Sequence, residues 1–441
     1  MTEKGENTVM EPRRLCTCET PPSVDITEAF AHYYGSSADT SPHNEQNQND
    51  DHDDDHVNVA SIQAILVPIL QRYGWAIVTI DPMKLAEIIM NTEGGPNTPA
   101  LLDLLNQDTA SHQKRLQSFF SSSSSNDQQS PPPPHGIYRH AESGSSQAGL
   151  VEPKESWEVQ RRHLPKNTHD SQHALYHYLH LLHNVGATVV ETCLGFSSNT
   201  VLAKHQDESL DLMRAFYYHA VDDEASDDDD DDSPMIMGSS EHTDWGSLTV
   251  VWQDDIGGLE TYCHQHERWN AVPVAPARPN NNNNNNNNNA IMSFVIHVSD
   301  ATSLALARNN NTTSHNNNAP LTTWPSPRHR VVSPINRPRT SLVYFAYPPP
   351  SLSLEQLAQA LEQQQAALRN STPKNNTNNN DTTLQQQVAY EDYFLLRNQA
   401  ASGHSISAQT QCEAIWKRPL KQVFLDKWQQ VQRSEEEGAM N

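Results

Sequence analysis

The sequence predicts a mainly β domain with flanking helices and an N-terminal α/β region. From Leu212 onward, short segments rich in β-branched and aromatic residues replace longer segments with helical spacing. Turn-forming residues separate these short segments at close intervals. Many short strands at such spacing are typical of a sandwich or a barrel. The predicted strands are LMRAFYYHA, GSLTVVWQ, GLETYCH, WNAVPVAP, IMSFVIHVSD, HRVVSP and TSLVYFAYP.

Helical spacing dominates the chain on both sides of these strands. The segment SIQAILVPILQRYGWAIVTI predicts an amphipathic helix, a turn at Gly74 and a short apolar strand. LAEIIMN and ALLDLLNQDTASHQKRLQSFF continue the helical pattern, and SQHALYHYLHLLHNVGATVVETCLGF predicts a long helix. Near the C-terminus, LEQLAQALEQQQAALRN and AYEDYFLLRNQAA also have helical spacing. The strands are therefore expected to lie among helices.

Tracts of Asn, Asp, Ser and Gln interrupt the chain and suggest its organisation. Hydrophobic residues make up only 35% of the sequence, so part of it is not expected to fold. We expect a disordered acidic tail over residues 1–58 and a helical and α/β region over 59–180. The β core is expected over 181–350, with low-complexity insertions in its loops, and C-terminal helices with an Asn-rich insertion over 351–441. Insertions in surface loops cost little free energy because closure entropy grows slowly with loop length.

Charge and cysteine content restrict the partners and the compartment. The formal net charge is -25, and Lys and Arg form no cluster, so nucleic acids and anionic membranes are not expected partners. The five cysteines show no disulfide framework, and the first residues, MTEKGENTVMEPRR, have no apolar signal-peptide core. No apolar run reaches the ~20 residues of a membrane span. We therefore expect a cytoplasmic protein, and we also expect it to be a monomer.

Two potential metal ligands stand one residue apart in the segment SSEHTDWGSLTV. On a strand, residues i and i+2 point to the same face, so His242 and Asp244 could both reach one ion if this segment enters a strand. His329, directly before an apolar β-like run, is the best candidate for a third ligand. Two imidazoles and one carboxylate on one side of a metal form the facial triad of non-haem Fe(II) oxygenases. An isolated H-x-D pair, in contrast, is usually a chance or surface pair.

An open Fe(II) site needs a co-substrate that supplies electrons, and a 2-oxo acid needs an anchor for its far carboxylate. Arg339 and Ser341 share one face if RTSLVYF is a strand. An Arg side chain can hold a carboxylate through two parallel hydrogen bonds, and the Ser hydroxyl adds a third donor. Alternatively, Arg339 is a structural ion-pair partner.

The segment from about residue 60 to 400 resembles the 2-oxoglutarate- and Fe(II)-dependent dioxygenases of the isopenicillin N synthase-like family. HTDWGSLTVVWQDDIGGLE is similar to the family's stretch with the first two ligands, and HRVVSPINRPRTSLVYF to its stretch with the distal ligand and the R-x-S anchor. Upstream, GLVEPKESWEV is similar to its PKESF segment and AFYYHA to its YYP strand. The resemblance implies a double-stranded β-helix, a jelly roll, surrounded by helices.

The resemblance also implies a role for each residue. His242, Asp244 and His329 would bind Fe(2+), and Arg339 and Ser341 would bind the C5 carboxylate of 2-oxoglutarate. Tyr218 would support this carboxylate, although His219 stands where the family usually has Pro, which leaves Tyr217 as a rival. Trp245 and Thr243 flank the ligands and are candidates for substrate contacts, with core packing as the alternative for Trp245.

A family member would couple decarboxylation of 2-oxoglutarate to oxidation of a small organic substrate by O2. Hydroxylation is the expected outcome, with desaturation or ring closure as the other outcomes in the family and ascorbate as reductant. One alternative is an oxidase like isopenicillin N synthase, which keeps R-x-S but does not consume 2-oxoglutarate. A second alternative is a catalytically silent scaffold or binding protein on the same fold.

Overall fold

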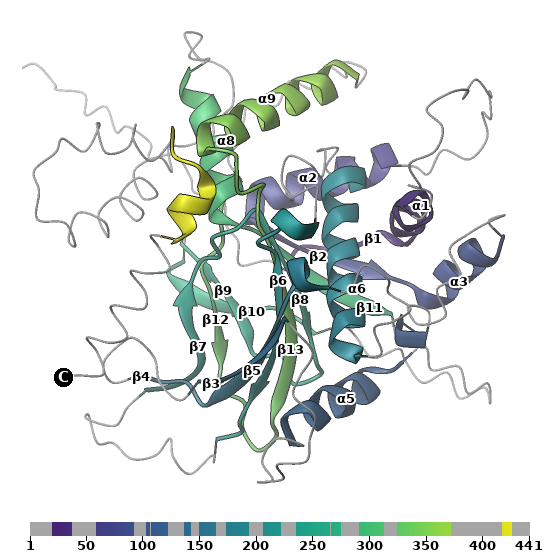
Figure 1. The fold of residues 1–441 in the computed structure, drawn as a ribbon, viewed down its shortest axis with the longest axis vertical. Coiled ribbons are helices and arrows are strands. Elements are labelled where there is room, and N and C mark those ends of the chain that lie inside the picture. The colour runs from purple at the N-terminus through teal and green to yellow at the C-terminus, as the bar shows by residue number, and fades with distance from the viewer. Residues whose placement is uncertain are drawn as a thin grey trace, which may run out of the picture.

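The chain folds around two β-sheets with helices outside them (Figure 1). The computed structural model describes residues 20–37, 59–91, 103–105, 107–121, 136–142, 150–164, 173–193, 206–221, 235–264, 266–274, 291–312, 324–371 and 417–425. None of the helices in these ranges combines the length and the apolarity that crossing a bilayer requires.

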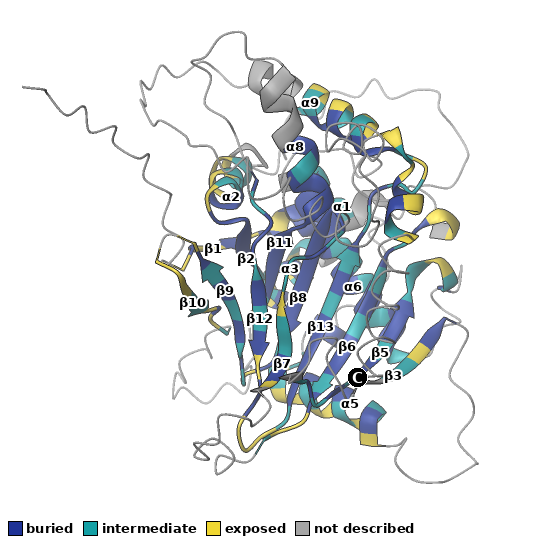
Figure 2. Cartoon of the chain, turned by 90° about the vertical axis from the view of Figure 1, so that its left-hand side faces the viewer, coloured by how far each residue is buried: buried dark blue, intermediate teal, exposed yellow. Residues whose placement is uncertain are grey.

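The larger sheet has eight strands in the order β1-β2-β11-β8-β13-β6-β5-β3. Neighbouring strands are antiparallel except for the parallel pair β1 and β2. Its central strands β8, β11 and β13 are almost entirely buried, as expected for segments rich in Val, Ile and Leu (Figure 2). The strands are β1 Ser23–Asp25, β2 Trp75–Ile80, β3 Ile137–Glu142, β5 Lys154–Gln160, β6 Leu212–Tyr218, β8 Leu248–Gln253, β11 Met292–Val298 and β13 Arg339–Ala346.

The smaller sheet has five strands in the order β10-β9-β12-β7-β4. It packs closely on the larger sheet: an added Cβ at Gly238 of β7 would lie 3.1 Å from Cδ1 of Tyr218 on β6. The two layers confirm the predicted mainly β fold with a jelly-roll core. The strands are β4 Leu150–Val151, β7 Met235–His242, β9 Leu259–Cys263, β10 Arg268–Ala271 and β12 His329–Val332.

Helix α6 covers the outer face of the larger sheet (Figure 1). Gly186 permits the close approach, because a Cβ there would lie 3.3 Å from Cγ2 of Val250 and 3.6 Å from Cε1 of Tyr344. The helices are α1 Thr27–Ser37, α2 Val59–Tyr73, α3 Pro82–Asn91, α5 Thr109–Ser121, α6 Ala174–Thr188, α8 Asp300–Thr312 and α9 Leu354–Ser371. Shorter helical segments are η1 Arg161–His163, η3 Val189–Cys193, η4 Gln206–Glu208 and residues 420–425.

A buried cluster of polar side chains connects α6 to the larger sheet. The carboxylate of Asp211, just before β6, accepts hydrogen bonds from the Tyr344 hydroxyl at 3.0 Å and from the Tyr347 backbone N–H at 2.7 Å. Nη1 of Arg161 lies 3.3 Å from the same carboxylate. Nδ1 of His183 on α6 lies 2.7 Å from the Tyr344 hydroxyl. The cluster therefore joins α6, η1 and the adjacent strands β6 and β13 at one buried point.

The N-terminal segment departs from the expected disorder. Residues 20–37 lie inside the range 1–58, yet they form β1 and α1, so the expectation is wrong for this part. Val24, Ile26 and Phe30 are buried in the hydrophobic core, and β1 pairs with β2. The range as a whole is acidic, but this short stretch has apolar residues at the spacing that a buried strand and helix require.

The expected domain boundary and the expected low-complexity insertions can be compared with the structure. The expected boundary between residues 180 and 181 lies inside α6, and β2, β3 and β5 from the N-terminal region belong to the larger sheet. Helix α8 extends to Thr312 and takes in the start of the Asn-rich stretch at 309–318. The acidic run at 50–56, the Asp tract at 227–232, the Asn tract at 280–289 and the segment AYEDYFLLRNQAA lie outside the described residues.

The folded N-terminal segment leads to a stability prediction. Phe30→Ala should lower the free energy of unfolding by about 3–5 kcal/mol, because the ring is fully buried and leaves a cavity. Urea denaturation followed by circular dichroism measures the change. His32→Ala on the same helix is the control, since His32 is exposed and its loss should change stability by less than about 0.5 kcal/mol. Equal stabilities of the two variants would contradict a folded N-terminal segment.

Candidate metal centre

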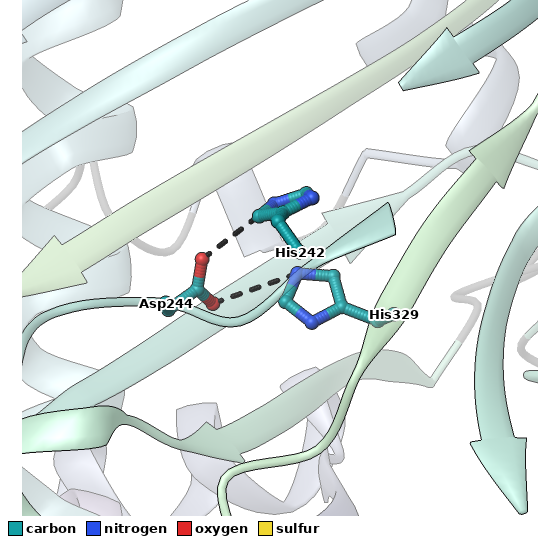
Figure 3. A group of neighbouring side chains, drawn as sticks. All are labelled: His242, Asp244 and His329. Atoms are coloured by element: carbon teal, nitrogen blue, oxygen red, sulfur yellow. Dashed lines mark ion pairs between the residues drawn. The ribbon is translucent and has the colours of Figure 1, made fainter. Parts of the chain in front are cut away.

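Three side chains with metal-binding atoms converge between the two sheets. His242 is the last residue of β7 and His329 is the first of β12, and the two lie opposite each other in the strand register. Asp244 follows β7 by two residues. Its Oδ1 lies 3.8 Å from Nε2 of His242 and its Oδ2 lies 3.7 Å from Nε2 of His329 (Figure 3). One ligand atom from each residue lies within 4.8 Å of the others.

Asp244 does not lie on a strand, contrary to expectation. Strand β7 ends at His242, so Asp244 lies in the connection to β8 and not on a strand face. Backbone hydrogen bonds hold this connection against other elements: Asp300 N donates to Asp244 O at 2.8 Å, and Ser247 N donates to Ala346 O at 2.7 Å. Gly246 is required here, because a Cβ would lie 2.2 Å from Ala346 O. The assumption that the H-x-D pair lies on a strand was wrong, although the two side chains do meet.

Backbone carbonyls orient both imidazoles. Nδ1 of His242 lies 2.7 Å from Ser240 O, and Nδ1 of His329 lies 3.0 Å from Pro327 O. A carbonyl can only accept, so Nδ1 carries the proton in each ring and Nε2 presents its lone pair to the centre. This second layer of hydrogen bonds is typical of metal-ligating histidines.

A buried ion pair from the N-terminal region supports His242. Oε1 of Glu152 accepts a hydrogen bond from the Ser240 backbone N–H, on the residue whose carbonyl orients His242. The other oxygen of Glu152 lies 2.8 Å from Nζ of Lys154, which also donates to Ser239 Oγ at 3.3 Å. Both side chains are less than a tenth exposed. The segment that precedes β5 is therefore connected to the metal centre.

Burial sets the ionisation of the three candidate ligands. Burial lowers the pKa of His242 to about 4, with a further contribution from His329, and it also lowers the pKa of His329. Burial opposes ionisation of Asp244, but the imidazoles of His329, His297 and His242 outweigh it and lower the pKa of this carboxyl. At neutral pH the centre therefore holds two neutral imidazoles and one carboxylate, which is the form that binds a divalent cation.

The donor set fits a divalent transition metal. Two Nε2 atoms and one carboxylate on one side of a site leave further coordination positions open, as in non-haem Fe(II) oxygenases. Oδ2 of Asp244 is buried and has no hydrogen-bond partner among the described residues. A bound cation would compensate this negative charge, which is otherwise costly to bury.

The R-x-S pair lies on β13 with both side chains on the inner face. Arg339 is fully buried, and its Nη1 donates to Ser341 Oγ at 3.0 Å. Its Nε donates to the Gly257 carbonyl, and its Nη2 lies 3.4 Å from Oε1 of Gln253. The guanidinium lies 4.7 Å from the centre of the Tyr218 ring. Arg339 forms no ion pair with a carboxylate among the described residues, although its charge acts on the carboxyl of Asp254 and opposes the rise in the pKa of that group that burial causes.

Asp254 fixes the backbone between the two anchor residues. Its Oδ2 accepts hydrogen bonds from the Thr340 N–H at 2.6 Å and from the Thr340 hydroxyl at 3.1 Å. The amide of Gln113 on α5 donates to the same oxygen at 3.0 Å. Because Thr340 points away from the inner face, this contact holds Arg339 and Ser341 in place from behind.

The structure separates the two Tyr candidates. Tyr218 lies opposite Arg339 in the register of β6 and β13 and is 3% exposed. Tyr217 points to the other face, where its ring stacks on Phe120 of α5. Of the residues that flank the ligands, Thr243 donates its hydroxyl to Oδ2 of Asp300 at 3.2 Å, and Trp245 is half-buried.

Three residues near the centre had no predicted role. Glu152 and Asp254 support the ligands and the anchor from behind, and His297 on β11 lies with Nδ1 3.7 Å from Oδ2 of Asp244. A single His inside the otherwise apolar strand MSFVIHV was the one available sequence signal. Glu152 and Asp254 become significant only through contacts with residues more than 80 positions away.

Comparisons with known proteins agree with this geometry. The model of the 2OG-Fe(II) oxygenase superfamily matches residues 209–348, a range that holds the three candidate ligands and the R-x-S pair. The 1-aminocyclopropane-1-carboxylate oxidases of Dictyostelium mucoroides and Dictyostelium discoideum are each 46% identical to the chain over 39 residues. This match spans 9% of the chain and 11% of the length of those relatives.

Solved structures of other proteins are similar to this chain at low sequence identity. A full-length Neurospora crassa protein, crystallised in complex with alpha-KG, is 16% identical, with 79% of this chain and 92% of that chain covered and a TM-score of 0.47. The rice dioxygenase for auxin oxidation is also 16% identical, with 87% and 96% covered and a TM-score of 0.40.

The family match and the metal centre coincide in one part of the chain. The two sheets bring His242, Asp244 and His329 to a single point, and all three lie within the matched range. Proteins of this superfamily use Fe(II) and 2-oxoglutarate, and the donor set and the anchor fit both. Residues 209–348 of the chain match the model of the 2OG-Fe(II) oxygenase superfamily, and the candidate metal centre lies inside this range.

Proposed function

We propose that this protein is an Fe(II)- and 2-oxoglutarate-dependent dioxygenase of the isopenicillin N synthase-like type that oxidises a small organic substrate. The observation that carries the proposal is the convergence of the triad and of a fully buried Arg339 between the same two sheets. Arg339 contacts Tyr218, and an added Cβ at Gly238, on the ligand-bearing strand β7, would lie next to that same tyrosine. The strand that carries His242 and the strand that carries Arg339 are thus linked through Tyr218.

The protein residues have distinct roles in this proposal. His242, Asp244 and His329 hold Fe(II) on one side through Nε2 and carboxylate atoms, and leave the opposite side for co-substrate and O2. Bound Fe(II) and 2-oxoglutarate supply the oxidising chemistry, in which 2-oxoglutarate and O2 are consumed, succinate and CO2 are formed and a substrate C–H bond is oxidised.

The anchor residues would hold 2-oxoglutarate by its far carboxylate. The guanidinium of Arg339 is immobilised by the Gly257 carbonyl and by the Tyr218 ring, which fixes its direction. Ser341 Oγ accepts a hydrogen bond from Arg339, so its own proton is available to donate to the carboxylate. The buried surroundings strengthen both interactions by excluding water.

The remaining assignments follow from the family resemblance and the composition. The substrate is a small organic molecule, contacted by Trp245 and Thr243, with ascorbate as reductant. We further propose a cytoplasmic monomer that does not bind nucleic acid or membranes. The catalytic core expected at residues 181–350 is extended to include the strands β2, β3 and β5 of the N-terminal region 59–180, and residues 351–441 follow it.

Turnover of 2-oxoglutarate tests the proposal directly. Anaerobically purified protein mixed with Fe(II), ascorbate, O2 and labelled 2-oxoglutarate should release labelled succinate, and the rate should rise when a metabolite from a screened set is a substrate. Substrate oxidation and O2 uptake without succinate would favour the isopenicillin N synthase-like oxidase. The absence of both across the screened set would favour the scaffold.

The ligand assignment predicts the behaviour of a metal-binding variant. His242→Ala should lose high-affinity Fe(II) binding, because two remaining ligands cannot hold the ion in a facial site. Anaerobic titration with Fe(II), or with Co(II) as a stable probe, measures the dissociation constant. His219→Ala is the matched control, since His219 is half-exposed and pairs with Glu155 away from the triad. Unchanged affinity in the His242 variant would contradict its role as a ligand.

The anchor assignment predicts a selective effect on the co-substrate. Arg339→Ala should raise the concentration of 2-oxoglutarate needed for half-maximal succinate formation by roughly 100-fold, as expected for a lost charge-assisted carboxylate contact. Metal affinity should stay within a few-fold of the unmodified protein. Arg337→Ala serves as the control, because Arg337 is exposed and pairs with Asp255. If both variants needed the same 2-oxoglutarate concentration, Arg339 would be a structural residue.

A further inference from the structure

His297 is a buried side chain at the metal centre that the ligand set does not include. It lies near the end of β11, on the larger sheet, opposite Thr249 of β8 and Trp75 of β2 in the register. The side chain is fully buried in a strand whose other residues are apolar or Ser. Neither ring nitrogen has a hydrogen-bond partner among the described residues.

The ring of His297 is directed toward Asp244. Its Nδ1 lies 3.7 Å from Asp244 Oδ2, and its ring centre lies 4.5 Å from that of His329. Asp244 Oδ2 is itself buried and without a hydrogen bond among the described residues. A potential donor and an ionised acceptor thus face each other, at a distance about 1 Å longer than a charge-assisted hydrogen bond. The hydrogen bond therefore requires the two side chains to lie closer together by about that difference.

The two oxygens of Asp244 have different neighbours. Oδ1 lies 3.8 Å from Nε2 of His242, whereas Oδ2 lies between His329 and His297. A carboxylate that offers both oxygens to a metal occupies two coordination positions. A hydrogen bond to one oxygen leaves a single oxygen for the metal and keeps a further position open for co-substrate.

We propose that His297 is a positioning residue that donates a hydrogen bond from Nδ1 to Oδ2 of Asp244 and thereby makes this carboxylate a one-oxygen ligand. The inference rests on the proposed function only in that Asp244 binds the metal. His297 is not a member of the three-residue group whose ligand atoms lie within 4.8 Å of one another, which favours a supporting role over a fourth ligand.

Two variants of His297 separate hydrogen bonding from packing. His297→Asn keeps a donor close to the position of Nδ1, and His297→Leu keeps similar bulk without any donor. Co(II) is the probe, titrated into the full chain without 2-oxoglutarate or substrate. The Leu variant should bind Co(II) about 10–100-fold more weakly, as expected for loss of a supporting hydrogen bond, and the Asn variant should stay within about 3-fold of the unmodified protein. The Co(II) absorption spectrum should change only in the Leu variant, because its coordination number changes.

Three outcomes of the Co(II) titrations would overturn the proposal. The first is an unchanged affinity and spectrum in His297→Leu. The second is an Asn variant as weak as the Leu variant, which would point to packing. The third is a loss in His297→Leu as large as that in His242→Ala, which would make His297 a ligand. Succinate formation by the unmodified protein is scored separately, so a failed dioxygenase reaction and a failed role for His297 are distinguishable.

Nuclear magnetic resonance of the unmodified protein provides a test that needs no stable Leu variant. In the Zn(II)-loaded chain, long-range ¹H–¹⁵N spectra should show the His297 ring protonated at Nδ1, with neither nitrogen bound to metal. The signals are assigned by their loss in His297→Asn. A metal-bound nitrogen, or a ring with its proton only on Nε2, would overturn the proposal.

Discussion

The burial of one carboxylate among three imidazoles is the constraint on which the site depends. Asp244 is 5% exposed, and a lone buried carboxylate would take up a proton or destabilise the fold. The imidazoles around it come from β7 and β12 of the smaller sheet and from β11 of the larger sheet. The three imidazoles therefore surround Asp244 only when the two sheets pack against each other.

The residues that converge at the candidate centre could be selected from the sequence more easily than the residues around them. His242, Asp244 and His329 could be selected because their residue types and order match a facial triad, and Arg339 and Ser341 because they alternate on a strand. The reasoning about Asp244 assumed a strand that in fact ends at His242. The two side chains meet because hydrogen bonds from Asp300 and Ser247 fold the connection back, and these contacts have no local signal in the sequence.

The supporting residues could not be predicted, for one physical reason. Glu152, Asp254 and His297 act through partners on strands remote in sequence, and their identity depends on which residues the sheet register places opposite each other. Composition misled in the same way at residues 20–37, where a few well-spaced apolar side chains in an acidic range are enough to add β1 and α1 to the core. The alternation of side chains on a strand and the order of the ligands are visible in short stretches of sequence. The residues that support the ligands come from distant parts of the chain and are not.

The low-complexity tracts lie in connections that do not set the register of paired strands. The Asp tract separates β6 from β7, and the Asn tract at 280–289 separates β10 from β11, and in each case the two strands belong to different sheets. The serine- and proline-rich tract at 121–134 lies between a helix and a strand. None of these connections joins strands that pair with each other, so their length does not set any strand register. The added closure entropy is also small.

The connection from β8 to β9, in contrast, helps to position Arg339, because the Gly257 carbonyl accepts a hydrogen bond from it. This connection is short and contains two glycines with positive φ. These tracts thus lie in connections that do not set strand register, whereas the connection from β8 to β9, which contacts the anchor, is short.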